Sequence, residues 1–186
     1  MFSFIGKLWR SLDIFGVYAK RRMDKKALKA KIKKQNRTPD SYKTWQLWTD
    51  GSVKDARGGW GFVAFNESRR RYIVRSAANP KTVIERMELQ AILSGLQAMS
   101  PGSIVTVYSD PSFIINDITN FLEEGDKPND HSYMFKQIRD TIKSLKLTVT
   151  FKHVKGHTGV EFNEWADKVA KEARLGNCID QTGTYN

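Results

Sequence analysis

From Thr44 onward, the pattern of short apolar runs limits the folds that this chain can adopt. The runs are closely spaced at first and are later separated by helix-like segments. Runs at 45–49, 60–65 and 71–75 have the composition of strands, with a turn expected at Gly58-Gly59, and their short connections indicate an antiparallel meander. Helix-like segments at about 82–99, after 110, at 133–144 and at 161–175 then alternate with strand-like runs at 104–108 and 147–154. The pattern predicts an α/β domain: a mixed five-stranded sheet with helices packed against it.

Four acidic residues stand in four separate motifs along this pattern. Asp50 and Asp110 end strand-like runs, whereas Glu88 and Asp167 lie on helix-like runs. Each has an ordinary explanation when taken alone, since an Asp can stabilise a turn or cap a helix. Together they suit hard divalent cations, which prefer oxygen ligands, and without a cation such a cluster would repel itself. The four acids therefore predict a metal-dependent enzyme that cleaves phosphodiesters.

A histidine motif precedes the last helix-like run. His157 lies in Val-Lys-Gly-His-Thr-Gly at 154–159, between two glycines that favour a mobile loop. A histidine in that position is suited to moving a proton. Asn163 and Asp167 are four residues apart, so they share one face of the predicted helix.

Positive charge is concentrated near the N-terminus. Residues 1–40 hold 12 Lys and Arg against 3 Asp, so 9 of the 11 net positive charges lie there. Apolar residues from Phe2 to Phe15 recur at helical spacing, which predicts an amphipathic helix. A basic block favours an anionic partner, either nucleic acid or lipid headgroups, although a solvated flexible arm is the alternative.

Two further features exclude classes of protein. The single cysteine, Cys178, excludes an internal disulfide framework and a cysteine-based zinc site. No apolar run approaches the roughly 20 residues that a membrane-spanning helix needs.

The breaker at 38–41 predicts a domain boundary, and we expect a basic amphipathic extension at 1–40, a catalytic domain at 41–176 and a C-terminal tail at 177–186.

In their order and spacing, the motifs resemble type 1 ribonuclease H over residues 44–176. The motifs are Thr-Asp-Gly-Ser at 49–52, Arg-Met-Glu-Leu at 86–89, Ser-Asp at 109–110, Val-Lys-Gly-His-Thr-Gly at 154–159 and Asn-Glu-Trp-Ala-Asp at 163–167. The resemblance implies the ribonuclease H fold, with strand order 3-2-1-4-5 and helices on both faces of the sheet. It also implies an endonuclease that hydrolyses the RNA strand of RNA–DNA hybrids with two Mg²⁺ ions, or Mn²⁺ as a substitute, and leaves 5′-phosphate and 3′-hydroxyl ends.

The same resemblance implies roles for individual residues. The metal-binding catalytic acids would be Asp50, Glu88, Asp110 and Asp167; His157 would be the catalytic loop histidine; and Gly58, Gly59 and Asn163 would contact substrate. We further expect a cytoplasmic monomer, in a bacterial or phage-infected cell, without a small-molecule cofactor. The N-terminal extension would bind nucleic acid or, alternatively, a membrane surface or a partner protein.

Some positions depart from the family pattern. Val83, Ile84 and Glu85 stand where the family often has Thr and two amides, and Pro111-Ser112 follows Asp110 where Ser-Gln is more usual. Since amides there help to read the minor groove, two alternatives stay open. One is a DNA or junction-specific nuclease on the same fold, and the other is a catalytically silent module that binds hybrids.

Overall fold

The computed structural model describes residues 43–124, 131–156 and 160–184. The predicted N-terminal extension lies outside these residues. The described elements are β1 (Thr44–Lys54), β2 (Arg57–Asn66), β3 (Arg71–Asn79), α4 (Ile84–Gln97), β4 (Ile104–Ser109), α5 (Ser112–Glu124), α6 (Ser132–Ser144), β5 (Thr148–His153), α7 (Glu161–Arg174) and β6 (Asp180–Thr184). The predicted succession of a three-strand meander and alternating helices and strands is confirmed.

The strands form one mixed sheet in the order β5-β4-β1-β2-β3-β6. Strands β1, β2 and β3 pair antiparallel, as do β3 and β6, whereas β4 pairs parallel with both β1 and β5. The predicted order of the first five strands is confirmed. A sixth strand extends the sheet beyond β3, within the segment that the sequence predicted to be a tail.

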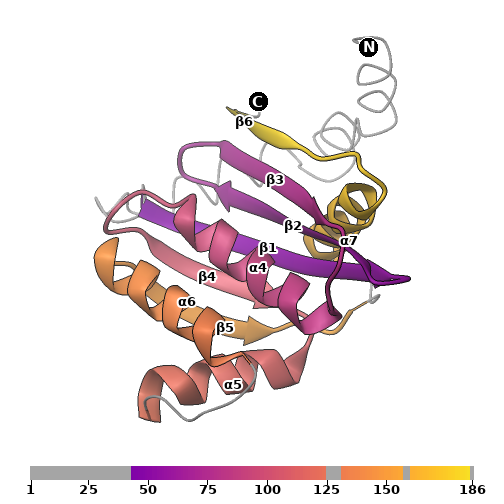
Figure 1. The fold of residues 1–186 in the computed structure, drawn as a ribbon. Coiled ribbons are helices and arrows are strands. Elements are labelled where there is room, and N and C mark those ends of the chain that lie inside the picture. Colours follow the sequence, from indigo (N-terminus) through magenta and orange to yellow (C-terminus); the bar gives the residue numbers. More distant parts are fainter. Residues whose placement is uncertain (1–42, 125–130, 157–159, 185–186) are drawn as a thin grey trace. The chain divides into compact units, whose positions relative to one another are not determined.

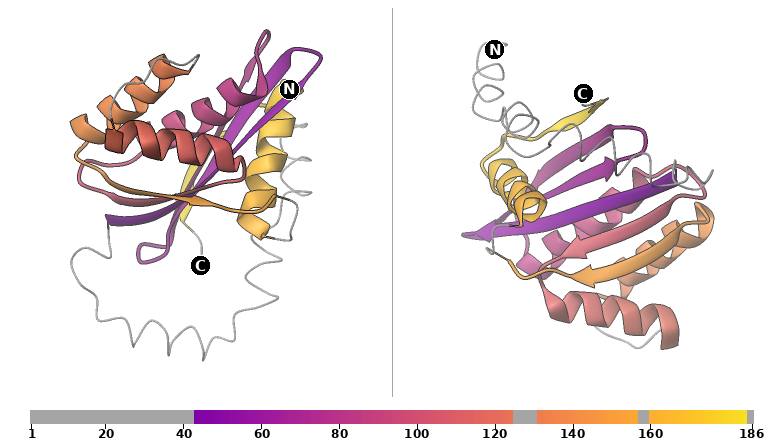
Figure 2. Two further views of the ribbon diagram at one scale, coloured as in Figure 1. Left: turned by 90° about the horizontal axis from the view of Figure 1, so that it is seen from below. Right: turned by 180° about the vertical axis from the view of Figure 1, so that it is seen from behind.

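Helices cover both faces of the sheet, as expected (Figures 1 and 2). Helices α4, α5 and α6 lie over one face, and their apolar sides meet the sheet in a core that includes Leu47, Phe62, Ile92, Phe135 and Ile138. Helix α7 lies on the other face, where an aromatic cluster joins it to β1 and β2. No helix among the described residues is long and apolar enough to cross a bilayer.

The turn between β1 and β2 differs from the prediction. Lys54 pairs with Arg57, so Asp55 and Ala56 form a two-residue hairpin loop, with φ values of 53° and 59°. Positive φ at both central residues is the geometry that matches the twist of a hairpin, although glycine or asparagine usually occupies it. The predicted turn at Gly58-Gly59 is therefore wrong, because both residues lie inside β2.

Glycines in β2 allow α7 to approach the sheet closely instead. A Cβ atom on Gly59 would collide with the backbone of Ala170 and Arg174. A Cβ on Gly61 would lie 2.9 Å from the backbone nitrogen of Ala170 and 2.8 Å from a methyl group of Val169. These glycines therefore fix the distance between α7 and the sheet, and α7 carries two of the predicted site residues.

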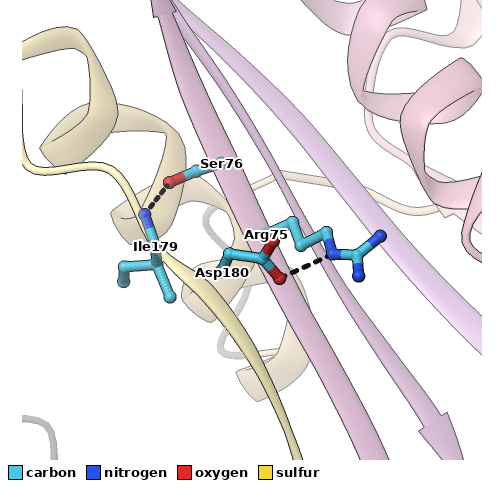
Figure 3. Close-up of polar contacts among 4 residues, drawn as sticks. All are labelled: Arg75, Ser76, Ile179 and Asp180. Carbon is cyan, nitrogen blue, oxygen red and sulfur yellow. Dashed lines mark hydrogen bonds and ion pairs between the residues drawn. The ribbon is translucent and has the colours of Figure 1, made fainter.

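Strand β6 is held to β3 by backbone pairing, and side-chain contacts add to it where β6 begins (Figure 3). The Ile179 N–H donates to Ser76 Oγ at 3.0 Å, and the Ser76 N–H donates to the Ile179 carbonyl at 2.8 Å. Arg75 Nε lies 2.7 Å from Asp180 Oδ1. An apolar strand signal is missing here, since β6 reads Asp-Gln-Thr-Gly-Thr.

Candidate metal centre

Two of the predicted acids lie side by side because of the parallel pairing of β1 and β4. Trp48 pairs with Tyr108, so Asp50, inside β1, and Asp110, directly after β4, both lie two residues further along the chain. Neighbouring strands are about 4.8 Å apart, and residues two apart share a face of the sheet. The central position of β1 and β4 thus places two carboxylates at one edge of the sheet.

The third acid comes from α4, which lies against β1. A Cβ atom on Gly51 would lie 2.7 Å from the Glu88 nitrogen and 3.0 Å from the carbonyl carbon of Met87. Only glycine therefore lets the helix come this close to the strand. The glycine that follows Asp50 in the sequence brings Glu88 to Asp50, which is a role that the sequence did not reveal.

Asp50, Glu88 and Asp110 form a compact carboxylate group. One oxygen atom from each side chain lies within 4.8 Å of the other two. Asp50 and Glu88 are each only 5% exposed, and Asp110 is half-buried. Three carboxylates at this spacing offer the oxygen ligands that hard divalent cations prefer.

Burial and mutual repulsion make these carboxyl groups hard to ionise. Burial, followed by the charges of Asp110 and Asp167, raises the pKa of Asp50 to about 8. Burial, followed by the charge of Asp50, also raises the pKa of Glu88 well above its usual value. Hydrogen bonding by the Gly51 backbone opposes both shifts without cancelling them.

One oxygen of the group has no protein partner. Glu88 Oε2 is buried and accepts no hydrogen bond from the residues that the structure describes. An unpaired buried carboxylate oxygen costs free energy unless something else satisfies it. The donor set and this oxygen both fit a divalent cation held by Asp50, Glu88 and Asp110.

The fourth predicted acid stands apart from this group. Asp167, on α7, is close enough for its charge to raise the pKa values of Asp50 and Glu88. However, Lys171 Nζ lies 2.7 Å from Asp167 Oδ2, one helical turn away. The lysine was not singled out in the sequence, although its spacing of four residues from Asp167 is a usable signal.

The predicted substrate-contacting residues are largely buried. Asn163, one turn before Asp167 on α7, is 3% exposed, and its Oδ1 has no partner among the described residues. Gly58 packs against Thr82 and Met87, and Gly59 packs against α7. Their contact with substrate stays a prediction.

The loop that carries the predicted histidine approaches Asp110. His157 itself lies outside the described residues. The residue before it, Gly156, is described, and a Cβ atom on it would lie 2.6 Å from Asp110 Oδ2. The Val154 N–H donates to the Ser109 carbonyl at 2.9 Å, which fixes the start of this loop beside β4. The glycine in Val-Lys-Gly-His thus lets the backbone come close to the carboxylate group.

Comparisons with known proteins agree with this fold. Residues 42–174 match the RNase H family. A ribonuclease H of Rhodopirellula baltica is 30% identical over 152 residues, which cover 74% of this chain and 95% of the relative. A ribonuclease H of Chlorobium phaeobacteroides is 33% identical over 143 residues, which cover 70% of this chain and 95% of the relative.

Solved structures show the same fold at lower identity. LC9-RNase H1, a type 1 RNase H with the type 2 active-site motif, has a TM-score of 0.62 at 16% identity, over 74% of this chain and 77% of its own. RNase H1 from Halobacterium salinarum has a TM-score of 0.58 at 16% identity, over 72% of this chain and 98% of its own.

Proposed function

Because this chain belongs to the ribonuclease H family, we propose that it hydrolyses the RNA strand of RNA–DNA hybrids and depends on divalent metal ions to do so. The observation that carries the proposal is the buried group of Asp50, Glu88 and Asp110, whose oxygens lie within 4.8 Å of one another. The unpaired Glu88 Oε2 supports a cation there.

The proposed cofactor is a pair of Mg²⁺ ions, with Mn²⁺ as a substitute. Asp50, Glu88, Asp110 and Asp167 would hold them. Such ions supply an activated water and stabilise the leaving 3′ oxygen, which gives 5′-phosphate and 3′-hydroxyl ends. The carboxylates themselves orient and retain the ions, and burial of Asp50 and Glu88 excludes bulk water from that side.

His157 would assist by moving a proton. The position of Gly156, the described residue before His157 in the chain, next to Asp110 supports this role. Asn163, Gly58 and Gly59 would contact the substrate. Recognition of RNA would require contacts to 2′-hydroxyls, which are the groups that distinguish it from DNA.

One observation keeps a second candidate in view, a DNA or junction-specific nuclease. Val83 and Ile84, just before and at the start of α4, are 55% and 40% exposed. Exposed apolar side chains cannot donate hydrogen bonds to 2′-hydroxyls. Discrimination between RNA and DNA at this position would therefore be weaker than with amides.

The test is a cleavage assay on matched labelled substrates: an RNA–DNA hybrid, duplex DNA and a four-way junction, each with Mg²⁺, with Mn²⁺ and with EDTA. We expect cleavage of the RNA strand alone, only with metal, and loss of cleavage in Asp110→Asn. Asp117→Asn is the matched control, because it removes the same charge from an exposed site on α5. Cleavage of the junction or duplex DNA would favour the second candidate. Metal-dependent binding without cleavage of any substrate would favour a silent module.

The domain organisation belongs to the same proposal. Residues 1–40 would be a basic arm that increases affinity for nucleic acid and 41–176 the catalytic domain, in a cytoplasmic monomer. The predicted tail at 177–186 supplies β6 to the sheet of that domain. Phosphate contacts release counterions, so the arm should steepen the salt dependence of hybrid affinity. Hybrid affinity measured against salt for the full chain and for a chain that starts at Asp40 tests this role. Identical slopes would exclude nucleic acid, and vesicle co-sedimentation would then test a membrane surface.

A further inference from the structure

Asp167 and Lys171 form an ion pair on α7 beside the carboxylate group. Their spacing of four residues places both side chains on one face of the helix. Lys171 Nζ and Asp167 Oδ2 are 2.7 Å apart, and the two side chains are 50% and 20% exposed, respectively. Lys171 thus occupies an oxygen of the one predicted metal ligand that the three-carboxylate group does not include.

The positive charge of Lys171 also acts on Asp50. The charge of Lys171 lowers the pKa of Asp50, while the charges of Asp110 and Asp167 raise it. Lys171 is therefore close enough to offset part of the negative charge at the group. Among the charged residues described as acting on Asp50, it is the one cation.

We propose that Lys171 is a positioning residue, whose ammonium group holds Asp167 out of the three-carboxylate group until a metal ion displaces it. This inference rests on the proposed metal-dependent function. In this arrangement Asp50, Glu88 and Asp110 are ready for a first ion, and Asp167 becomes available as a ligand only when its ion pair opens. A lysine ammonium is a point charge with freely rotating donors, and a half-exposed pair of this kind opens readily.

The competing explanation is that Lys171 binds a substrate phosphate directly. The two roles differ in what they do to metal binding without nucleic acid. A phosphate-binding lysine would leave metal affinity almost unchanged and would act on the KM for the hybrid. A lysine that competes with metal for Asp167 would weaken metal binding even when no substrate is present.

Calorimetric titration of the full chain with Mg²⁺, without nucleic acid, tests the proposal. We expect Lys171→Gln to bind Mg²⁺ up to about fivefold more tightly, because the ion pair with Asp167 no longer has to open and a solvent-exposed pair is worth up to about that factor. Lys171→Arg, which keeps the pair, should stay close to the wild type. Lys168→Gln, an exposed lysine on the same helix, changes the net charge equally and should also stay close to the wild type.

A second pair of variants shows whether the effect passes through Asp167. In an Asp167→Asn background, Lys171→Gln should no longer change Mg²⁺ affinity, because the ion pair is already lost. Unchanged affinity in Lys171→Gln with a raised KM, or an increase that persists in the Asp167→Asn background, would overturn the proposal and leave the metal centre standing. Absence of Mg²⁺ binding by the wild type would overturn the metal centre itself.

Discussion

The carboxylate group and the β3–β6 edge are both built from charged and polar side chains, but only the second is balanced by its own partners. At the edge, Arg75 pairs with Asp180, and Ser76 exchanges two hydrogen bonds with Ile179. In the carboxylate group, Asp50 and Glu88 are buried beside further negative charge, and one oxygen has no partner among the described residues.

The comparison shows what each region does for the protein. An exposed contact between complementary groups, such as the one at β6, adds a little stability. Its groups already pair with one another and leave none to bind a ligand. Buried like charges reduce the stability of the metal-free fold, and they are tolerated where a ligand completes them. The imbalance is therefore the sign of a binding site.

The largest expected effect is on catalysis. Asp50→Asn should reduce hybrid cleavage to background, because it removes the ligand at the centre of the proposed site. The same change should raise the melting temperature in EDTA near neutral pH, since an amide removes the cost of burying a carboxyl group that must keep its proton in the folded chain. Cleavage rates and thermal melts, with Asp117→Asn as the control, measure both. Wild-type turnover by Asp50→Asn in Mg²⁺ would mean that the site is elsewhere.

The second effect is a pH dependence that only the carboxylate group should produce. The Asp50 carboxyl has a pKa of about 8 in the folded protein, against an ordinary value of 3.8. Between these values the folded chain keeps a proton that the unfolded chain has lost, so stability falls as pH rises. The contribution of the Asp50 carboxyl group to stability is present in full below about pH 4 and is lost as pH passes about 8.

Melting temperatures of the metal-free protein between pH 5 and pH 8.5 test this dependence. The decline should be shallower in Asp50→Asn, which cannot ionise at this position. Saturating Mg²⁺ should also flatten it, because the cation stabilises the ionised carboxylates. Equal slopes in the wild type and Asp50→Asn would show that Asp50 titrates normally.

The third effect is confined to the β3–β6 edge. Ser76→Ala removes the acceptor of the Ile179 N–H and should lower the free energy of unfolding by about 1 kcal/mol. Mg²⁺ affinity should not change, since the edge is not part of the metal centre. Denaturant unfolding and Mg²⁺ titration give the two values, and a loss of Mg²⁺ affinity would show that the edge and the centre are coupled.

The smallest effect is that of the exposed ion pair. A double-mutant cycle with Arg75→Gln and Asp180→Asn should give a coupling energy of roughly 0.2–1 kcal/mol. The side chains are 42% and 73% exposed, so the coupling should weaken further at high salt. A coupling energy above about 2 kcal/mol that is independent of salt would show that the Arg75–Asp180 pair behaves as a buried pair and not as an exposed one.

Much of the fold could be predicted because its signals are local. The alternation in β1, the apolar face of α6 and the breakers between elements each depend on neighbouring residues, and the strand order followed from the family resemblance. The sequence missed β6 because its residues are polar, and it is a strand only because β3 offers an edge with matching contacts. It also misplaced the β1–β2 turn, since the glycines of β2 are there for packing against helices.

The sequence by itself determined which acids are available and on which elements they lie. It placed Asp110 at a strand end and Glu88 and Asp167 on helices, and the structure bears out these three positions. Asp50, predicted to end a strand, lies inside β1 instead, because the strand continues to Lys54 as one arm of the hairpin with β2. Those placements depend on hydrophobic periodicity and on turn residues, which short windows of sequence contain.

Only the tertiary structure decided which of these acids meet. The Trp48–Tyr108 register brings Asp50 beside Asp110, and the bare Cα of Gly51 brings Glu88 to both. Lys171, in contrast, keeps Asp167 in an ion pair outside the group. Distances of a few ångströms between elements far apart in the chain depend on backbone packing and on competition between charged partners, and neither is encoded in a local pattern of residues.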